Sequence, residues 1–156
     1  MNLLISKVGL LNAKNRLLVM KENLAAAIEE TALLYNNAGD TWHDNPAWIQ
    51  SSRTTNTLQN QIDELDAILG CTLLHIDDLP VEEGFVSLGS EVILTREGVE
   101  QTWIILGELE SDPDENIMSA NAPFASTIIG KKVGDIFEFR GKKIEIISSK
   151  RWSGLE

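Results

Sequence analysis

The side chains best suited to chemistry lie in one short polar segment, Gly39–Pro46. It holds two carboxylates, Asp40 and Asp44, with Trp42 and His43 between them. Carboxylate oxygens are ligands for hard cations such as Mg²⁺, whereas an imidazole is a poor ligand for that ion. Carboxylates beside glycine and proline also end and cap helices. The residues alone therefore leave two interpretations open, a cation-binding loop and a pair of helix caps.

Long helices are predicted on both sides of this segment. From about Ser6 to Ala38 there is no proline, and apolar residues recur in two heptad rows: Leu10, Leu17 and Leu24, and Ala13, Met20, Ala27 and Leu34. From Pro46 to Leu69 a second helix carries Leu58, Ile62, Leu65 and Leu69 on one face. Because the loop between them is short, the helices must be antiparallel neighbours. This predicts a coiled-coil hairpin over residues 1–76, with its tip loop at 39–45.

The rest of the chain, residues 77–156, is predicted to be a small β-rich domain, which makes the fold class α+β. Short runs of strand-forming residues alternate there with turn residues, at 89–95, 101–109, 116–120, 136–140 and 143–149. Arg140–Lys142 reads as a hairpin turn, and Pro123–Ile129 as a short helix. The acidic segments Asp77–Pro80 and Glu82–Gly84 mark the expected linker, and His75 is expected to be a linker residue at the domain junction.

Composition limits the possible functions. The 156 residues carry a formal net charge of −11, which argues against direct binding to duplex nucleic acid. The single cysteine, Cys71, excludes an internal disulfide, and the charged N-terminal segment matches neither a signal peptide nor a membrane span. We therefore expect a cytoplasmic, monomeric protein without a membrane partner. With two histidines and no phosphate-binding glycine loop or nucleophile motif, an independent enzyme is not expected.

Several motifs resemble the GreA/GreB family of bacterial transcript-cleavage factors. The segment Ile117–Asp135 is similar to the family signature of Ile-Ser, a proline among small residues, an aliphatic pair, Gly-Lys and Val-Gly-Asp. Gly84–Val92 looks like the family's entry strand, and Gly39-Asp40, Asn45 and Trp48 resemble its hairpin tip. The resemblance extends over residues 10–150.

The resemblance implies a factor that acts on RNA polymerase. Its coiled coil would enter the secondary channel, while the second domain, FKBP-like in fold, would hold the channel rim through Phe124 and Ser126. The tip carboxylates Asp40 and Asp44 would help bind a second Mg²⁺ in the polymerase active site, so that water cleaves the 3′ end of backtracked RNA. No intrinsic cofactor is implied.

Other tip residues receive contact roles from the same resemblance. Trp42, at a tip with little to bury against, is expected to stack on the nascent RNA 3′ end or to lie beside the polymerase active site. His43 is expected to be solvated or to touch phosphate when protonated, and Asn45 to make a tip contact. Arg53 is the only basic residue of the second helix, so it is the candidate for an RNA phosphate contact, with a solvated side chain as the alternative.

The tip also departs from the family pattern. Three residues, Thr41-Trp42-His43, separate Asp40 from the next acid where active members have two, and that acid is Asp44 instead of glutamate. One added residue moves a carboxylate by up to roughly 3.5 Å. Two functions stay open. The chain either stimulates cleavage, or it is a Gre-like inhibitor or modulator that occupies the secondary channel without promoting cleavage. A peptidyl-prolyl isomerase is disfavoured, because the aromatic residues of the second domain lie in strand patterns that need them for the core.

Overall fold

The computed structural model describes residues 2–155, which form two compact units. One unit is Asn12–Cys71, and the other joins residues 2–11 to residues 72–155. The N-terminal residues therefore belong with the β-rich unit, which differs from the predicted bounds of 1–76 and 77–156. No helix in the described part of the chain is long and apolar enough to cross a bilayer.

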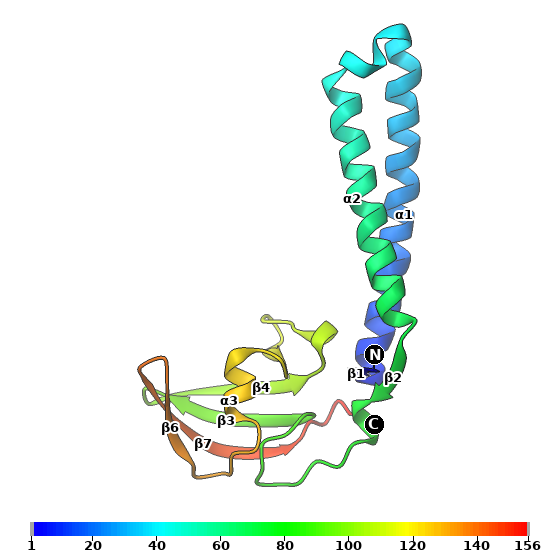
Figure 1. The fold of residues 1–156 in the computed structure, drawn as a ribbon. Helices are drawn as coiled ribbons and strands as arrows, with labels where there is room; N and C mark the ends of the chain where they lie inside the picture. The colour runs from blue at the N-terminus through cyan, green and yellow to red at the C-terminus, as the bar shows by residue number, and fades with distance from the viewer. Residues whose placement is uncertain (1, 156) are drawn as a thin grey trace. The chain divides into compact units, whose positions relative to one another are not determined.

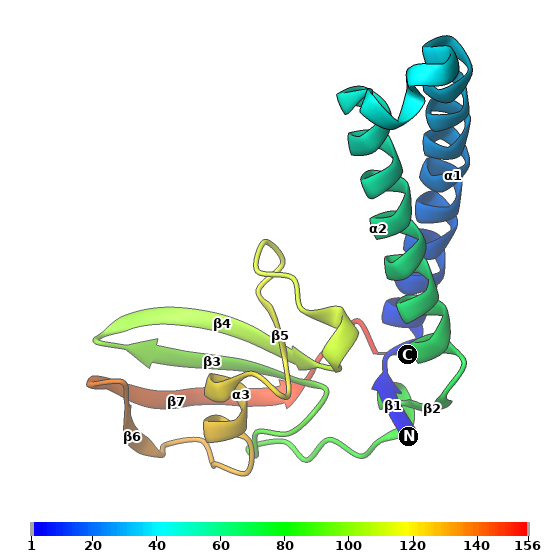
Figure 2. The ribbon, with the colours of Figure 1, turned by 45° about the horizontal axis from the view of Figure 1, so that its top comes forward.

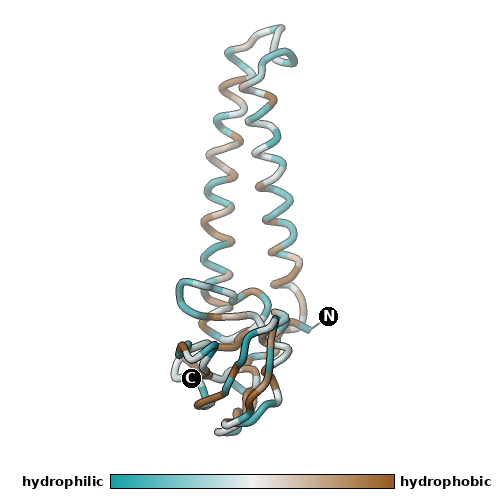
Figure 3. Tube along the Cα trace, turned by 90° about the vertical axis from the view of Figure 1, so that its left-hand side faces the viewer, coloured by the Kyte–Doolittle hydropathy of each residue, from teal (hydrophilic) through white to brown (hydrophobic). Residues whose placement is uncertain are grey.

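The two predicted long helices are confirmed. Helix α1 covers Lys7–Ala38 and α2 covers Pro46–Leu69, joined by the 3-10 turn η1 at Gly39–Asp44 (Figure 1). Apolar and polar residues alternate along both helices (Figure 3), and the inward positions of the predicted heptads are the most buried: Ala13, Leu17, Ile62 and Leu65. The seam therefore holds the hairpin together through apolar burial.

Nearer the tip the seam becomes polar. Thr31 continues the heptad row of Leu17, and its hydroxyl lies 2.6 Å from Ser51 Oγ and 3.2 Å from Thr55 Oγ1. Thr31 Oγ1 also donates to Ala27 O at 2.8 Å. These partners satisfy half-buried hydroxyls that would otherwise be costly to withdraw from water.

The second unit contains two sheets (Figure 2). Strands β1, Asn2–Ile5, and β2, Thr72–His75, form a parallel pair. The larger sheet has the order β5-β4-β3-β7-β6, in which only β4 and β5 are parallel. Its strands are β3 at Ser90–Arg96, β4 at Val99–Leu106, β5 at Ile117–Ser119, β6 at Ile136–Phe139 and β7 at Lys142–Arg151. The mixed sheet after a helical hairpin confirms the α+β fold class.

A short helix and two tight turns complete this unit. Helix α3, Pro123–Ile128, buries Ala125 and Ile128 against the sheet core. The predicted turn at Arg140–Lys142 is present, with φ values of 50° at Arg140 and 76° at Gly141. Positive φ at both central residues suits the right-handed twist of a two-residue hairpin.

The parallel pair β1–β2 was not predicted. His75, expected in a linker, pairs with Ile5 at the end of β2, and Ile5 is fully buried. The next residues form the short turn η2, Ile76–Asp78, in which Asp77 is buried and its Oδ2 accepts a hydrogen bond from Lys7 N at 2.8 Å. The expected linker is therefore ordered at its start, because its carboxylate satisfies a free N–H at the start of α1.

Glu110, from the short turn η3 at Glu108–Glu110, binds the same helix start. Its Oε2 accepts hydrogen bonds from Ser6 N and Gly107 N, each at 3.0 Å, and its Oε1 contacts Ser6 Oγ. A Cβ at Gly9 would overlap this carboxylate. Glycine at this helical position is thus explained by the close approach of Glu110.

Candidate functional site at the hairpin tip

The tip is shaped by a glycine and an asparagine at the two helix ends. Gly39 ends α1 with φ +58°, the left-handed conformation that glycine adopts most easily. Asn45 begins α2, and its Oδ1 accepts hydrogen bonds from Ala47 N at 3.0 Å and Trp48 N at 3.4 Å. Asn45 is therefore the N-cap of α2, and the six residues from Gly39 to Asp44 form one 3-10 turn.

Trp42 has packing partners that the sequence analysis did not anticipate. Its ring centroid lies 5.4 Å from that of Tyr35, at the end of α1, and 4.6 Å from that of Trp48, in the first turn of α2. His43 packs edge-on against it at 5.5 Å. The expectation that Trp42 has little to bury against was wrong: it is half-buried in an aromatic cluster that joins both helices through the turn.

The two tip carboxylates point to solvent. Asp40 is exposed, and the Asp44 side chain is 81% exposed, with its Oδ2 3.6 Å from His43 Nε2. Because Asn45 caps α2, neither oxygen of Asp44 is needed for that purpose. Of the two residues before Pro46 that could cap α2, Asp44 and Asn45, it is Asn45 that does so, and the carboxylate of Asp44 stays exposed.

The tip does not by itself form a complete metal site. Within residues 2–155 no three His, Cys, Asp or Glu side chains gather where they could hold a metal ion. A Mg²⁺ ion prefers six oxygen ligands, including water. Two exposed carboxylates on one short turn can add ligands to an ion that is already held elsewhere, but they cannot select it alone.

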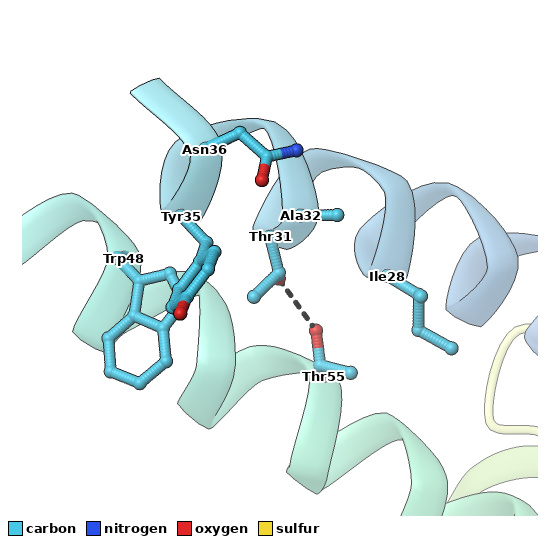
Figure 4. A pocket seen from close by; sticks show the side chains of 7 residues that line it. All are labelled: Ile28, Thr31, Ala32, Tyr35, Asn36, Trp48 and Thr55. Atoms are coloured by element: carbon cyan, nitrogen blue, oxygen red, sulfur yellow. Dashed lines mark hydrogen bonds between the residues drawn. The ribbon is translucent and has the colours of Figure 1, made fainter. Parts of the chain in front are cut away.

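A groove of about 300 Å³ lies beside the aromatic cluster, between α1 and α2 (Figure 4). Ile28 and Tyr35 come from α1, and Trp48 and Thr55 from α2. Its floor reaches the hydroxyls of Thr31 and Thr55, which are hydrogen-bonded across the hairpin. The half-polar seam thus ends at an apolar hollow directly below the tip.

Comparisons with known proteins identify the chain's relatives. Residues 81–149 match the family described as "Transcription elongation factor, GreA/GreB, C-term". The transcription elongation factor GreA of Mesoplasma florum is 26% identical over 140 residues, which cover 88% of each chain. The β-rich part of the chain thus matches the C-terminal domain of the GreA/GreB family.

Other GreA proteins match over shorter stretches. GreA of Ruegeria pomeroyi is 31% identical over 58% of this chain and 61% of its own, and GreA of Bacillus licheniformis is 39% identical over 38% and 39%. Among solved structures, GreA factor homolog 1 of Thermus thermophilus has 19% identity and a TM-score of 0.45, over 96% of this chain and 99% of that one.

Two further residues that the GreA/GreB resemblance singled out lie in the second unit. Phe124 is half-buried on α3, and its ring lies 5.1 Å from that of Phe139 on β6. Ser126 is exposed, and its Oγ donates to Ala120 O at 3.3 Å. Arg53, in the hairpin, is exposed on α2.

Sequence reasoning missed two features of this chain. The first is the aromatic cluster at the tip, which the seven-residue spacing from Tyr35 to Trp42 could have indicated. The second is an aromatic pocket in the β-rich unit, lined in part by Trp103, Phe124 and Phe139. All three rings pack against the core as expected, but they are only partly buried, so part of each also lines this pocket.

Proposed function

We propose that the chain is a transcription elongation factor that binds RNA polymerase, places its hairpin in the secondary channel and stimulates cleavage of backtracked RNA 3′ ends. The match to the GreA/GreB family supports RNA polymerase as the partner. In this proposal the polymerase carries the nucleolytic activity and the Mg²⁺, and the chain is an accessory factor with no cofactor of its own.

One observation carries the finer part of the proposal. Asn45 caps α2, so the neighbouring Asp44 keeps both carboxylate oxygens exposed at the end of the hairpin. Asp40, at the start of the same turn, is exposed as well. We assign these two carboxylates to the second Mg²⁺ of the polymerase active site and to the attacking water.

We propose the remaining contacts for residues of the tip, of α2 and of the second unit. Trp42 and His43 would lie beside the RNA 3′ end, where Trp42 is held by its cluster and His43 is exposed. Arg53, exposed on α2, would contact an RNA phosphate. In the second unit, Phe124 and Ser126 would contact the channel rim.

Cleavage in purified, deliberately backtracked elongation complexes tests this function. Wild-type protein should accelerate release of the RNA 3′ fragment, and Asp44→Ala should reduce that acceleration by on the order of 10- to 100-fold, as for loss of a group that supports a metal site. Glu30→Gln, which neutralises an exposed carboxylate on the shaft of α1, is the matched control. Equal activity of Asp44→Ala and wild type would refute the proposed role of the tip.

A second function is favoured by the contact of His43 with Asp44. When protonated, His43 Nε2 at 3.6 Å can pair with Asp44 Oδ2 and occupy an oxygen that a metal ion needs. The chain would then occupy the channel as an inhibitor or modulator. In the same assay, slower cleavage than with no factor, together with retained binding to the polymerase, supports this alternative over stimulation.

A further inference from the structure

The two helices of the hairpin differ in the side chains that they expose. Helix α2, every residue of which lies within the described 2–155, exposes no large apolar side chain. In α1, by contrast, Leu11 and Leu18 are each 59% exposed, and further large apolar side chains are exposed as well: Val8, Val19, Ile28, Leu33 and Tyr35. Single exposed apolar residues are ordinary, but a helix that is apolar on more than one side usually packs against more than one neighbour. Helix α2 supplies only one.

A second heptad row, here called the α1 strip, runs along the exposed side of α1, separate from the seam with α2. Its four members are all exposed: Leu11, Leu18, Ala25 and Ala32. Because residues seven apart fall on the same side of a helix, they form one narrow apolar row. The two leucines occupy its N-terminal half and the two alanines its C-terminal half. A second copy running in the opposite direction would therefore set a large side chain against a small one at each level.

The charges of α1 are sorted along the same direction. Its basic residues all precede its acidic ones: Lys7, Lys14, Arg16 and Lys21, and then Glu22, Glu29 and Glu30. No two opposite charges are three or four residues apart, so the helix pairs none of them internally. Within residues 2–155, Lys14, Glu22 and Glu29 form no ion pair with any side chain. Only Lys21 has a partner, Asp66 of α2, at 3.1 Å.

We propose that the α1 strip binds the same strip of a second copy of this chain, with the two helices antiparallel. One register satisfies size and charge together. When Leu18 lies opposite the partner's Ala25, counting along the helices also sets Leu11 opposite the partner's Ala32. The same count sets Lys14 opposite the partner's Glu29 and Lys21 opposite the partner's Glu22. Each of these contacts occurs twice, because the arrangement has a two-fold axis.

Charge decides the direction of pairing. A parallel pair would set Lys14 against Lys14 and Glu29 against Glu29, whereas the antiparallel pair joins opposite charges at every charged level. Lys21 can keep its bond to Asp66, because an ammonium group has three donors. Charged pairs at a helix interface determine orientation and register more than affinity. With two leucines per copy the dimer is weak, and it replaces the monomer expected from the sequence.

Sedimentation velocity of the purified full chain, without polymerase, tests the dimer directly. The wild type should change from monomer to dimer as its concentration rises through the micromolar to millimolar range. Lys14→Glu should weaken the dimer at least tenfold, because it sets like charges opposite each other at two symmetry-related levels, and Glu29→Lys should do the same. Both side chains are exposed, and far-UV circular dichroism of each variant controls for folding.

The charge swap gives the more specific test. The double variant Lys14→Glu/Glu29→Lys should dimerise as the wild type does, and so should an equimolar mixture of the two single variants, since both restore opposite charges. The matched controls are Arg16→Glu and Glu30→Lys, which make the same changes of charge at exposed positions on the side of α1 away from the strip. Both controls should dimerise as the wild type does.

Three results would overturn the inference. One is a wild type that stays monomeric over the whole concentration range. Another is an equal loss of dimer in Arg16→Glu and Lys14→Glu, which would mean that overall charge alone controls association. The third is failure of both the double variant and the mixture to dimerise. The inference goes beyond the proposed function: a monomer that stimulates cleavage would refute the dimer alone, whereas a dimer that does not bind polymerase would refute the proposed function alone.

Discussion

The ring of Trp42 packs against that of Trp48 with centroids 4.6 Å apart and planes inclined at 74°. Trp42 belongs to the tip turn and Trp48 to α2, so the contact fixes the turn that carries both exposed carboxylates. Such edge-on pairs contribute about 0.5–1.5 kcal/mol beyond the burial of their area. The chemistry at the tip thus depends on an apolar contact that touches neither Asp40 nor Asp44.

Replacing Trp42 by alanine should destabilise the hairpin. We expect a loss of about 1–3 kcal/mol in the free energy of unfolding, less than for a fully buried aromatic residue because Trp42 is half-exposed. Urea unfolding followed by far-UV circular dichroism measures it. The control is Val19→Ala, at an exposed position of α1, which should change stability by less than about 0.5 kcal/mol. An equal loss of stability in both variants would contradict the stabilising role of Trp42 in the aromatic cluster.

The cap of α2 gives a second prediction. Asn45→Ala removes the acceptor for Ala47 N and Trp48 N, and should lower stability by about 1 kcal/mol. Asn45→Asp should restore most of this loss, since aspartate is an equally good N-cap. The denaturation midpoints of the two variants are the measurement, and a destabilising Asp variant would argue against side-chain capping.

The approach of Glu110 to Gly9 predicts coupling between the two residues. Gly9→Ala alone should be destabilising, because the new Cβ overlaps the carboxylate that holds Ser6 and Gly107. After Glu110→Ala removes that carboxylate, Gly9→Ala should instead stabilise by up to about 1 kcal/mol through helix propensity. A double-mutant cycle from chemical unfolding tests this reversal of sign, and simple additivity would rule it out.

The Mg²⁺ dependence of RNA cleavage distinguishes metal binding by the tip from mere occupancy of the polymerase channel. If Asp44 supplies a ligand to the second ion, Asp44→Ala should raise the Mg²⁺ concentration needed for half-maximal factor-dependent cleavage on the order of tenfold. Asp44→Glu, which keeps the charge, should stay closer to wild type. The readout is the initial cleavage rate across a Mg²⁺ titration, and identical curves for the wild type and both variants would exclude a ligand role.

Helical periodicity was the most informative part of the sequence. One residue from each predicted row of α1, Ala13 and Leu17, is buried, as are Ile62 and Leu65 of α2. A heptad pattern over 20 or more residues has few alternative structures. The start of α2 followed from Pro46 and its preceding asparagine. The heptad repeat and the residues at the start of α2 were therefore enough to predict the hairpin.

The unpredicted features depend on contacts between distant parts of the chain. Strand β1 has four residues, and its partner β2 lies about 70 positions away, so no local turn signal marks the pair. Arg96 follows two core residues on one face of β3, yet its side chain lines a pocket whose other walls come from β4, β5, α3 and β6. Trp42 seemed unpartnered because its contacts come from two different helices.

The parallel pairing of β1 with β2 has a consequence for how the chain folds. Residues 6–71 connect the two strands, so a loop of this length must close before β1 and β2 can pair. Loop closure loses more entropy as the connection lengthens, whereas the contacts of a helical hairpin are local and form quickly. Early formation of the hairpin brings its two ends together, and the seam between α1 and α2 thereby promotes the slower assembly of the sheet.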